Sequence, residues 1–385
     1  MIHIKHVSIL SSRNGGFEIQ DLTKQYRIVG IIANLYPADK RSLYGRRALD
    51  DFGRRDIPIA WGEKATTKDR PIRPNQFPCD FMAENVVFTP YGEPKSDPKD
   101  PAEIESGISL LVRLVKEIVE TPDGQPRTPR PEEKLHFLLV SSFADIWTLV
   151  ELLPESFKKA TARVVLQGDY TVEHNTSNSS YTLKANHEAN NNRFDINSAD
   201  KLHEFICRNN IPSVVVTKVA ATASALPTQV LKDLAATGHK WGKHLYDIYD
   251  ELSVQYYKDS GDEKTRFQCH MDEKWFLGTR TNWFLTHTEH DPYPRGADVL
   301  PYVQVTPYDP LAGLEVAGAD VRDALKIFTP FKDQTIHKIV GKRAPNPVTN
   351  DLGDTGINVV QIQTVLQALW KGSLLASKGK HNLCK

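Results

Sequence analysis

The sequence has no excess of charge of either sign, no long apolar run and no paired cysteines, and each absence excludes a class of protein. Lys plus Arg and Asp plus Glu number 48 each, so no global field attracts nucleic acid or an anionic membrane surface. No stretch of about 18 apolar residues occurs, and no cleavage-site pattern follows the opening MIHIKHVSIL. We therefore expect a soluble, unprocessed cytoplasmic protein with no nucleic-acid or membrane partner.

The residue types that hold zinc or carry redox chemistry are few and scattered. The four cysteines are Cys79, Cys207, Cys269 and Cys384. None has the paired spacing of a zinc site or a redox motif, so we interpret them as reduced thiols. Four histidines likewise lack mutual metal spacing and are expected at the surface: His174, His187, His270 and His287.

What the sequence does contain is a series of short β-branched runs bounded by polar or turn residues. Most are continuously apolar, which is typical of strands that are buried on both faces in a parallel sheet covered by helices. The runs are Val7–Leu10, Arg27–Ala33, Ile57–Ala60, His136–Val140, Arg163–Leu166, Ser213–Thr217 and Tyr302–Val305.

Helical patterns lie between these runs. The clearest is Glu103–Glu120, where apolar residues recur at helical spacing along one face. The others are Ser42–Phe52, Ala144–Leu153, Asn197–Cys207, Thr228–Ala236, Trp241–Tyr257 and Ile357–Leu375. Because strand and helix alternate, we predict an α/β fold with a doubly wound, mostly parallel sheet flanked by helices.

The chain shows no internal repeat and no convincing linker, so a single domain over residues 1–385 is the simplest interpretation. Residues 64–101 are dense in Pro, Lys, Asp and Arg, which predicts a polar insertion or a long loop. The polar stretch Asp169–Asn192 is expected to be a second loop, either functional or mobile. Residues 320–385 are expected to form a C-terminal helical extension.

Several segments, taken in order, resemble the inosine/uridine-preferring nucleoside hydrolase superfamily. VGIIAN and RRDIPIAWGE are similar to the family's second strand with its Asn and to the strand that follows. RVVLQGD is similar to a later strand, and TPYDPLAGL resembles the late HDPLA element. The region NHEANNNRFDINSADKLHEF is most similar to a less-studied branch of the superfamily. The resemblance spans residue 7 to roughly residue 320 and implies a nucleoside-hydrolase-like fold.

The resemblance also implies a calcium ion that activates water for cleavage of the N-glycosidic bond, held mainly by an acidic cluster after the first strand. Here LSSRNGGFE places Ser11, Arg13, Phe17 and Glu18 on those four acidic positions. A guanidinium where a divalent cation should sit is disfavoured by Coulomb repulsion. We therefore predict no metal and no cofactor, with a remodelled calcium site as the alternative.

Other positions that the resemblance assigns to the pocket keep polar side chains. Asp309 matches the late carboxylate ligand, and Tyr308 replaces the His that precedes it in the family. Asn34 aligns with an Asn near the sugar, and Glu188 with Asn190 or Asn191 aligns with residues that grip ribose hydroxyls. We predict Glu188, Tyr308 and Asp309 as catalytic residues. The predicted substrate-binding residues are Ser11, Arg13, Asn34, Asn190 and Asn191.

A structural role competes with each functional one. Asp309 precedes a Pro and a helical pattern, so it is equally suited to be a helix N-cap. Glu188 and the Asn run fit a solvated loop, and Tyr308 fits a core aromatic residue with a wet edge. Arg13 fits an ion pair with Glu18 or Asp309 at the place where the resemblance puts the calcium ion.

Three functions remain open from the sequence. The first is a diverged enzyme that acts without calcium on a small polar or polycyclic molecule, with lyase, cyclase or isomerase chemistry as plausible as hydrolysis. The second is an N-ribosyl hydrolase that cleaves nucleosides with a remodelled calcium site. The third is a pseudoenzyme that binds a ligand or a protein without turnover. The expected partners are a small-molecule substrate and further copies of the chain in a homodimer or homotetramer.

Overall fold

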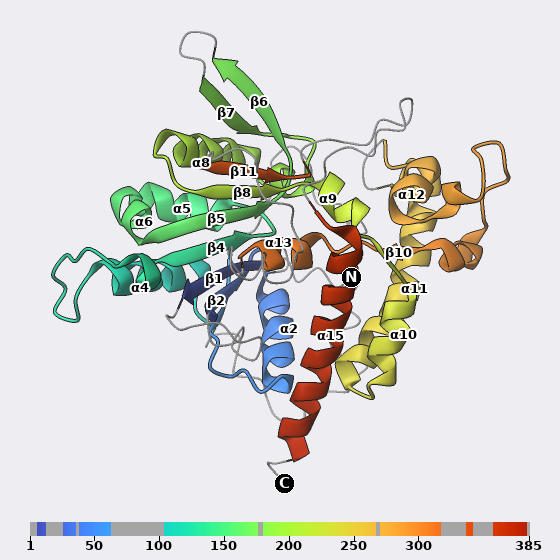
Figure 1. Ribbon diagram of the computed structural model, residues 1–385, viewed down its shortest axis with the longest axis horizontal. Coiled ribbons are helices and arrows are strands. Elements are labelled where there is room, and N and C mark those ends of the chain that lie inside the picture. Colours follow the sequence, from blue (N-terminus) through green and yellow to red (C-terminus); the bar gives the residue numbers. More distant parts are fainter. Residues whose placement is uncertain are drawn as a thin grey trace.

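Among the residues that the structure describes, seven strands form one central sheet in the order β11-β8-β5-β4-β1-β2-β3 (Figure 1). The computed structural model describes residues 6–12, 26–35, 38–62, 104–175, 180–266, 270–316, 336–341 and 357–382. The strands of the sheet are β1 (His6–Ser12), β2 (Tyr26–Ala33), β3 (Ile59–Trp61), β4 (Leu135–Leu139), β5 (Thr161–Gln167), β8 (Ser213–Val216) and β11 (His337–Val340). β1 pairs antiparallel with β2 and β4, and the other pairings are parallel. The predicted α/β fold with a mostly parallel sheet is confirmed.

The strand β4 shows why these runs are apolar throughout. Successive side chains of a strand point to opposite faces of a sheet. Phe137 and Leu139 enter one buried cluster, and Leu138 and Val140 enter a second cluster across the sheet. A strand with a core on each side favours apolar residues at nearly every position, and His136 is the one polar residue of β4.

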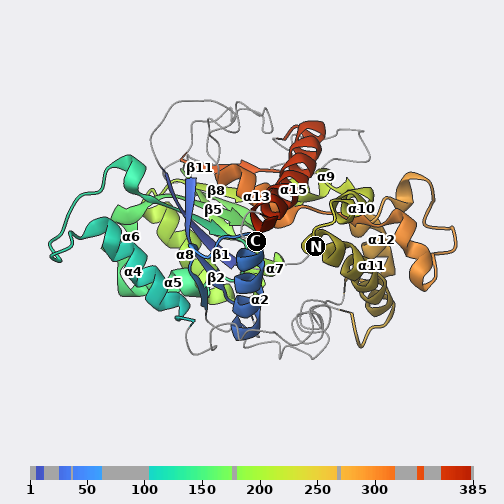
Figure 2. The same cartoon turned by 90° about the horizontal axis from the view of Figure 1, so that it is seen from below.

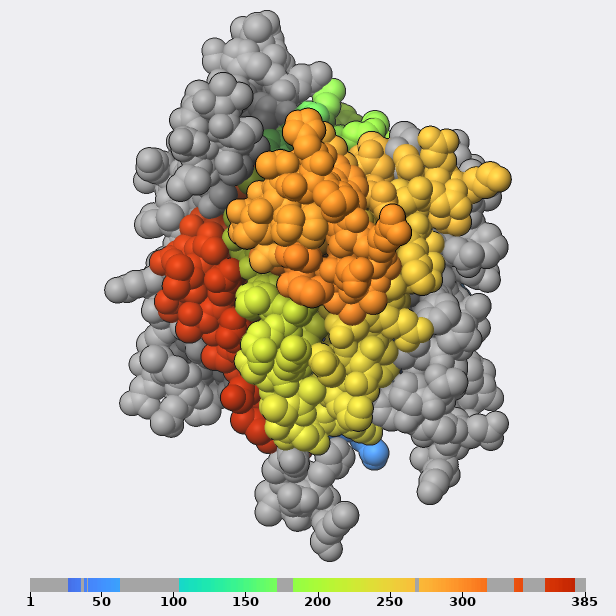
Figure 3. All heavy atoms as spheres, turned by 90° about the vertical axis from the view of Figure 1, so that its right-hand side faces the viewer, coloured from blue at the N-terminus to red at the C-terminus, as the bar shows by residue number. Residues whose placement is uncertain are grey.

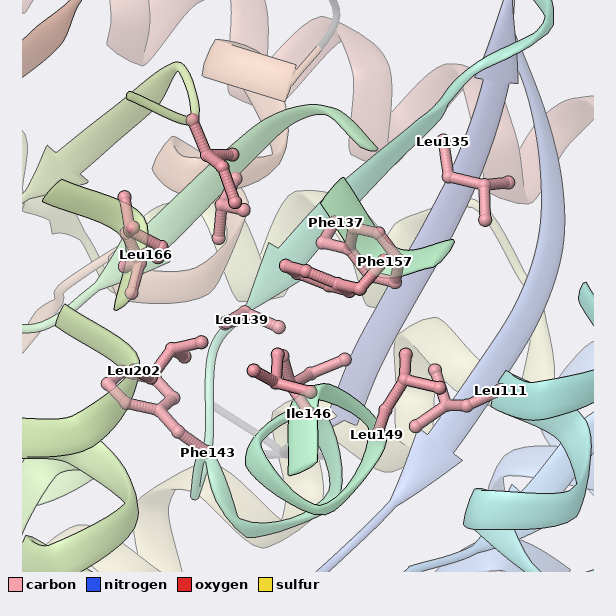
Figure 4. Close-up of a cluster of buried hydrophobic side chains, with 14 of the residues drawn as sticks. Leu111, Leu135, Phe137, Leu139, Phe143, Ile146, Leu149, Phe157, Leu166 and Leu202 are labelled. Atoms are coloured by element: carbon pink, nitrogen blue, oxygen red, sulfur yellow. The ribbon is translucent and has the colours of Figure 1, made fainter. Parts of the chain in front are cut away.

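Helices cover the first face of the sheet, and the first core lies beneath them (Figure 2). They are α4 (Gly107–Val119), α5 (Ala144–Leu152), α6 (Pro154–Ala160) and α8 (Ile196–Arg208). α4 begins at Ser106, whose side chain accepts a hydrogen bond from the backbone N–H of Ser109. Figure 4 shows Phe137, Phe157 and Ile146 meeting in this core.

The second face is covered by helices that come mainly from later in the sequence. They are α9 (Lys218–Ala223), α10 (Gln229–Ala236), α13 (Tyr308–Val316) and α15 (Val359–Asn382), and all contribute to the second core. α2 (Ala38–Asp51) packs at the β3 edge, where Leu49 contacts a small cluster made of isoleucines from β2 and β3 and of Ile57 just before β3. With helices on both faces, the sheet is wound as the alternation of elements predicts.

A third cluster lies away from the sheet in a helical layer built from α11 (Lys240–Gly261), α12 (Glu273–Arg280) and η6 (Gly296–Tyr302). Its buried side chains are Tyr257, Phe276, Leu277, Trp283, Val299 and Val303. Figure 3 shows this side of the molecule, with the orange segment around α12 above the yellow-green helix α10. The helical layer therefore has its own core and reaches the sheet beside its carboxyl edge.

Three expectations from the sequence are corrected. Asp169–Asn192 is not a loop, since β6 (Tyr170–Asn175) and β7 (Ser180–Ala185) form an antiparallel hairpin within it. The run at Tyr302–Val305 yields only β10 (Gln304–Val305), which pairs with β9 (Leu226–Pro227) outside the main sheet. The C-terminal extension is not only helical, because β11 forms the edge of the sheet before α15. Residues 64–101 lie outside the described residues.

Candidate functional site

A pocket of about 240 Å³ opens at the carboxyl edge of the sheet. Its floor comes from the end of β5 and the segment after it, at Gln167, Gly168 and Asp169. Its walls come from α7 (Asn190–Arg193), the first residue of α9, α12 and the first turn of α13. Ligands of open α/β sheets bind at this edge, because the loops that follow parallel strands converge there. The pocket is therefore the candidate functional site.

The α7 wall is fastened to the end of β5 by side-chain amides. Asn191, only 3% exposed, donates from its Nδ2 to the backbone oxygen of Gln167 at 2.7 Å and to its Oε1 at 2.5 Å. Asn192 donates to the backbone oxygens of Asp169 and Asn186, both at 2.8 Å. These bonds satisfy backbone groups that a loop would otherwise leave unpaired. Asn191 lines the pocket, and its amide nitrogen supports the wall.

Two more of the predicted site residues stand on the same wall. Asn190 lines the pocket as the first residue of α7. Glu188 lies at the mouth, where its side chain is 74% exposed and pairs with Arg193 at 3.3 Å. Glu188 is therefore as exposed as a residue of a solvated loop would be, and its carboxylate still borders the pocket.

Tyr308 and Asp309 approach the pocket from α13. Tyr308 is only 9% exposed and belongs to the second core, so it is both a core aromatic residue and a lining residue. Asp309 lies within the first turn of α13, one residue inside the helix rather than at its cap. A carboxylate is favoured there by the helix dipole. The two residues thus meet Glu188, Asn190 and Asn191, which precede them by more than a hundred positions.

The remaining wall is cationic and aromatic. Lys218 Nζ lies 5.3 Å from the centroid of the Trp275 ring, and the guanidinium carbon of Arg280 lies 5.7 Å from the same centroid. Arg280 also lies 5.1 Å from the ring centroid of Tyr308. Desolvation in the pocket wall and the charge of Arg280 lower the pKa of Lys218, and Asp169 acts against them.

The backbone before Lys218 is held by the edge strand β11. The Thr217 N–H donates to Val340 O at 3.0 Å, and its hydroxyl donates to Gly341 O at 2.8 Å. Gly341 has φ +85°, a conformation that glycine adopts at no steric cost. β11, absent from our sequence expectations, therefore positions a pocket residue.

Asn34 lies elsewhere, at a second point on the carboxyl edge. It is fully buried, and its Nδ2 donates to Ser142 O at 2.8 Å and to Asp145 Oδ2 at 2.7 Å. It does not line the pocket. The described contacts therefore give Asn34 a structural role, in which it joins the end of β2 to the start of α5.

Ser11 and Arg13 are not brought to the pocket in the described residues. The backbone of Ser11 pairs with Leu135 at the amino end of β4, because β1 runs antiparallel to its neighbours. The pocket lies at the opposite edge, beyond the end of β5. Arg13, with Phe17 and Glu18, lies outside the described residues.

Sequence reasoning missed Lys218, Trp275 and Arg280 and placed His270 only at the surface. His270 is exposed, and it also lines the pocket with its ring 6.4 Å from that of Trp275. For Lys218 a signal existed, since it lies two residues after the buried strand SVVV. Nothing in the local pattern of α12 indicates that its Trp and Arg reach the sheet edge.

The described residues do not offer a donor set that fits calcium. No group of three or more His, Cys, Asp and Glu side chains among them could hold a metal ion. Asp169 already accepts hydrogen bonds from Tyr170 N and from Asn186 Nδ2. Lys218 and Arg280 add positive charge to the same pocket, and a divalent cation would be repelled by both. We therefore derive no chemical step through calcium.

Several solved structures have a similar fold. The type III effector protein XopQ complexed with adenosine diphosphate ribose matches with a TM-score of 0.65 and 16% identity, over 92% of this chain and 86% of that one. The effector protein XOO4466 matches with a TM-score of 0.62 and 18% identity, over 90% and 85%. A purine-preferring ribonucleoside hydrolase from Gardnerella vaginalis matches with a TM-score of 0.51 and 17% identity, over 91% of each chain. The fold is nucleoside-hydrolase-like.

At these identities the likeness concerns the fold, and function has to be argued from the site. No protein-family model matches the sequence of this nucleoside-hydrolase-like chain, and no curated protein matches it either. Among the helices in the described ranges, none has both the length and the apolar character needed to cross a bilayer.

Proposed function

We propose that this chain is a diverged nucleoside-hydrolase-like enzyme that binds a small ribosyl compound in the pocket and acts on it without calcium. The observation that carries the proposal is the convergence of Glu188, Asn190, Tyr308 and Asp309 on one cavity at the carboxyl edge of the sheet. Amide and carboxylate groups are the usual partners of a sugar diol, because amides donate and accept hydrogen bonds and carboxylates accept them, both in fixed directions.

The shape of the pocket supports a small ligand. A volume of about 240 Å³ suits a nucleoside-sized fragment better than a polymer. One of the structures with the same fold was solved with adenosine diphosphate ribose, which is a ribosyl compound. That ligand belongs to the other protein, and here it guides the choice of compounds to test.

Asp309 is the side chain we assign to proton transfer. It lies in the first turn of α13 and borders the cavity. A carboxylate in that position can accept a proton from a sugar hydroxyl or from a water molecule. Glu188 is 74% exposed at the mouth, where it can bind the outer part of a ligand.

The test is a binding and turnover assay on one set of compounds: adenosine, inosine, ribose 5-phosphate and adenosine diphosphate ribose. Each is titrated calorimetrically into chelator-treated protein, and the mixtures are then analysed by mass spectrometry with chelator and with added calcium. We expect binding and product formation that are unchanged by the chelator. Product formed only with calcium would instead identify an ordinary ribohydrolase. Binding with no product under either condition would identify a ligand-binding protein, and no binding at all would refute the proposal.

A further inference from the structure

Two cationic side chains share one aromatic ring inside the pocket. Lys218 comes from the start of α9 and Arg280 from the last residue of α12, sixty-two positions later in the chain. Lys218 Nζ and the Arg280 guanidinium lie 5.3 Å and 5.7 Å from the Trp275 ring centroid. Cations favour an aromatic face, so the ring gathers both charges at one place. Two elements from different layers thus deliver positive charge to the same wall.

Neither cation forms an ion pair in the part of the chain that the structure describes, although Asp169 acts on Lys218 from a longer distance. No carboxylate oxygen lies within 4.0 Å of either side chain, although that range contains sixteen other ion pairs. The polar neighbours of Arg280 are the tyrosines Tyr308, Tyr256 and Tyr249. The Nε of Arg280 is buried and has no hydrogen-bond partner in the described residues.

This arrangement carries an electrostatic cost. Like charges on one ring repel each other, and the pocket wall removes part of their water. Desolvation and, second, the charge of Arg280 lower the pKa of Lys218, while Asp169 acts in the opposite direction. An anionic group between the two side chains would remove the repulsion and satisfy the unused donors.

We propose that Lys218, Arg280 and Trp275 form a subsite for a phosphate or diphosphate group of the ligand. A phosphoryl group suits the pair because the planar guanidinium can donate two parallel hydrogen bonds while the ammonium acts as a point charge. The inference rests on the proposed function and narrows its ligand from any ribosyl compound to a phosphorylated one.

The placement of the subsite relative to the polar wall supports this ligand. Asn190 and Asp309 line the same cavity as Lys218 and Arg280. A ribosyl phosphate carries both kinds of group, a diol that needs neutral or anionic acceptors and a phosphate that needs cations. The polar wall therefore suits the sugar of such a molecule, and the cationic wall suits its phosphate.

The experiment is calorimetric titration of the whole chain with ribose, ribose 5-phosphate, adenosine, adenosine diphosphate ribose and inorganic pyrophosphate. The variant Lys218→Met removes one charge from an exposed residue and preserves the length of the side chain. Lys232→Met in α10 is the matched control, since Lys232 is exposed and outside the pocket. Arg280→Lys retains the positive charge and loses the planar set of N–H donors. Because lysine still fills most of the space of the arginine side chain, this variant tests the second cation without creating a cavity.

We expect phosphorylated ligands to bind at least tenfold more tightly than ribose and adenosine. Lys218→Met should weaken the phosphorylated ligands by about tenfold to a hundredfold and leave the neutral ones unchanged, because a hydrogen bond to a charged group contributes about 1.5 to 3 kcal/mol. Arg280→Lys should act in the same direction, and Lys232→Met should have no effect. A carboxylate analogue, ribonate, should bind more weakly than ribose 5-phosphate.

The two proposals fail separately. If ribose and adenosine bind as tightly as their phosphorylated counterparts, or if Lys218→Met spares the phosphorylated ligands, the anion subsite is wrong and the ribosyl pocket stands. If pyrophosphate binds and responds to Lys218→Met while no ribosyl compound binds, the subsite stands and the proposed function is wrong. If neither pyrophosphate nor any phosphorylated ligand binds at millimolar concentration, the inference is overturned.

Discussion

The amide nitrogen of Asn34 lies 2.7 Å from the carboxylate of Asp145, a residue 111 positions later in the chain. Both side chains are almost completely buried, and the bond joins the end of β2 to the first turn of α5. Asn34 also donates to the backbone oxygen of Ser142, directly before that helix. A single amide thus holds together two loops at the carboxyl edge of the sheet.

Removing that amide should destabilise the fold without altering the pocket. Asn34→Ala leaves the Asp145 carboxylate buried without this donor, and loss of a hydrogen bond to a charged group costs about 2 to 3 kcal/mol. We expect the free energy of unfolding, measured by urea titration, to fall by that amount. Asp233→Asn, at an exposed site on α10, is the control and should change stability by less than about 0.5 kcal/mol. Equal effects of the two variants would contradict the role we give Asn34.

Gly62 should tolerate no side chain, for a reason of space rather than backbone conformation. A Cβ at Gly62 would lie 2.5 Å from Asp145 Oδ2 and 2.6 Å from Asn34 Cβ. Gly62→Ala should therefore destabilise the protein by about 1 to 3 kcal/mol, as overpacking does. Gly372→Ala in α15 is the opposite case, since nothing lies within 4 Å of its Cβ. It should stabilise the protein by roughly 1 kcal/mol, and thermal unfolding of both variants measures the contrast.

Stability should fall as the pH drops below 6.5, partly because of His203. This side chain is 4% exposed on α8, and burial lowers its pKa from 6.5 to about 4. In the unfolded chain this imidazole is protonated below about pH 6.5, whereas in the folded chain it stays neutral down to about pH 4. Protonation therefore favours unfolding between these two pH values. His136, whose pKa burial also lowers to about 4, acts in the same direction.

Urea unfolding at several pH values between 7.5 and 5 measures this effect. The expected slope is about 1.4 kcal/mol per pH unit for each such histidine. His203→Gln should make the dependence shallower, while His290→Gln at the surface should not change it. A His203→Gln variant with the original pH dependence would show that this residue is not the buried titrating group.

Asp309 should affect turnover more than binding. Asp309→Asn preserves the shape of the side chain and removes its ability to accept a proton, so kcat on the active ribosyl compound should fall by about a hundredfold or more. The dissociation constant should change much less. Asp298→Asn, exposed on η6, is the control and should retain full activity. A fall in binding with unchanged kcat would instead make Asp309 a ligand-binding residue.

The sequence predicted the architecture well because burial on both faces leaves a strong local signal. Apart from His136 and Ser213, β4 and β8 consist of apolar residues, and each strand is buried along nearly its whole length. The direction of β1 left no such signal, since a parallel and an antiparallel strand can share one apolar pattern. The hairpin β6–β7 was missed because its polar side chains read as a loop.

The pocket residues also fall into two groups, those that the sequence could name and those that only the fold brings in. Glu188, Asn190, Asn191, Tyr308 and Asp309 were named because a resemblance supplied their positions, and all five line the pocket, while their roles stay predictions. Trp275 and Arg280 belong to a helix that meets the pocket only through tertiary packing. No periodicity in the chain encodes which far segment closes over a sheet edge, so these residues were visible only in the fold.

The pocket draws its walls from two layers of the molecule, each with a buried cluster of its own. Asn191, Tyr308 and Lys218 rest on the sheet and its two cores, while Trp275 and Arg280 belong to the helix α12, which packs on the third cluster. A ligand that contacts both walls links the two layers, so its binding free energy stabilises the packing of the helical layer against the sheet. Substitution of Phe276 or Val299, which belong to the third cluster and do not line the pocket, should then weaken ligand binding, and a saturating ligand should offset part of the lost stability.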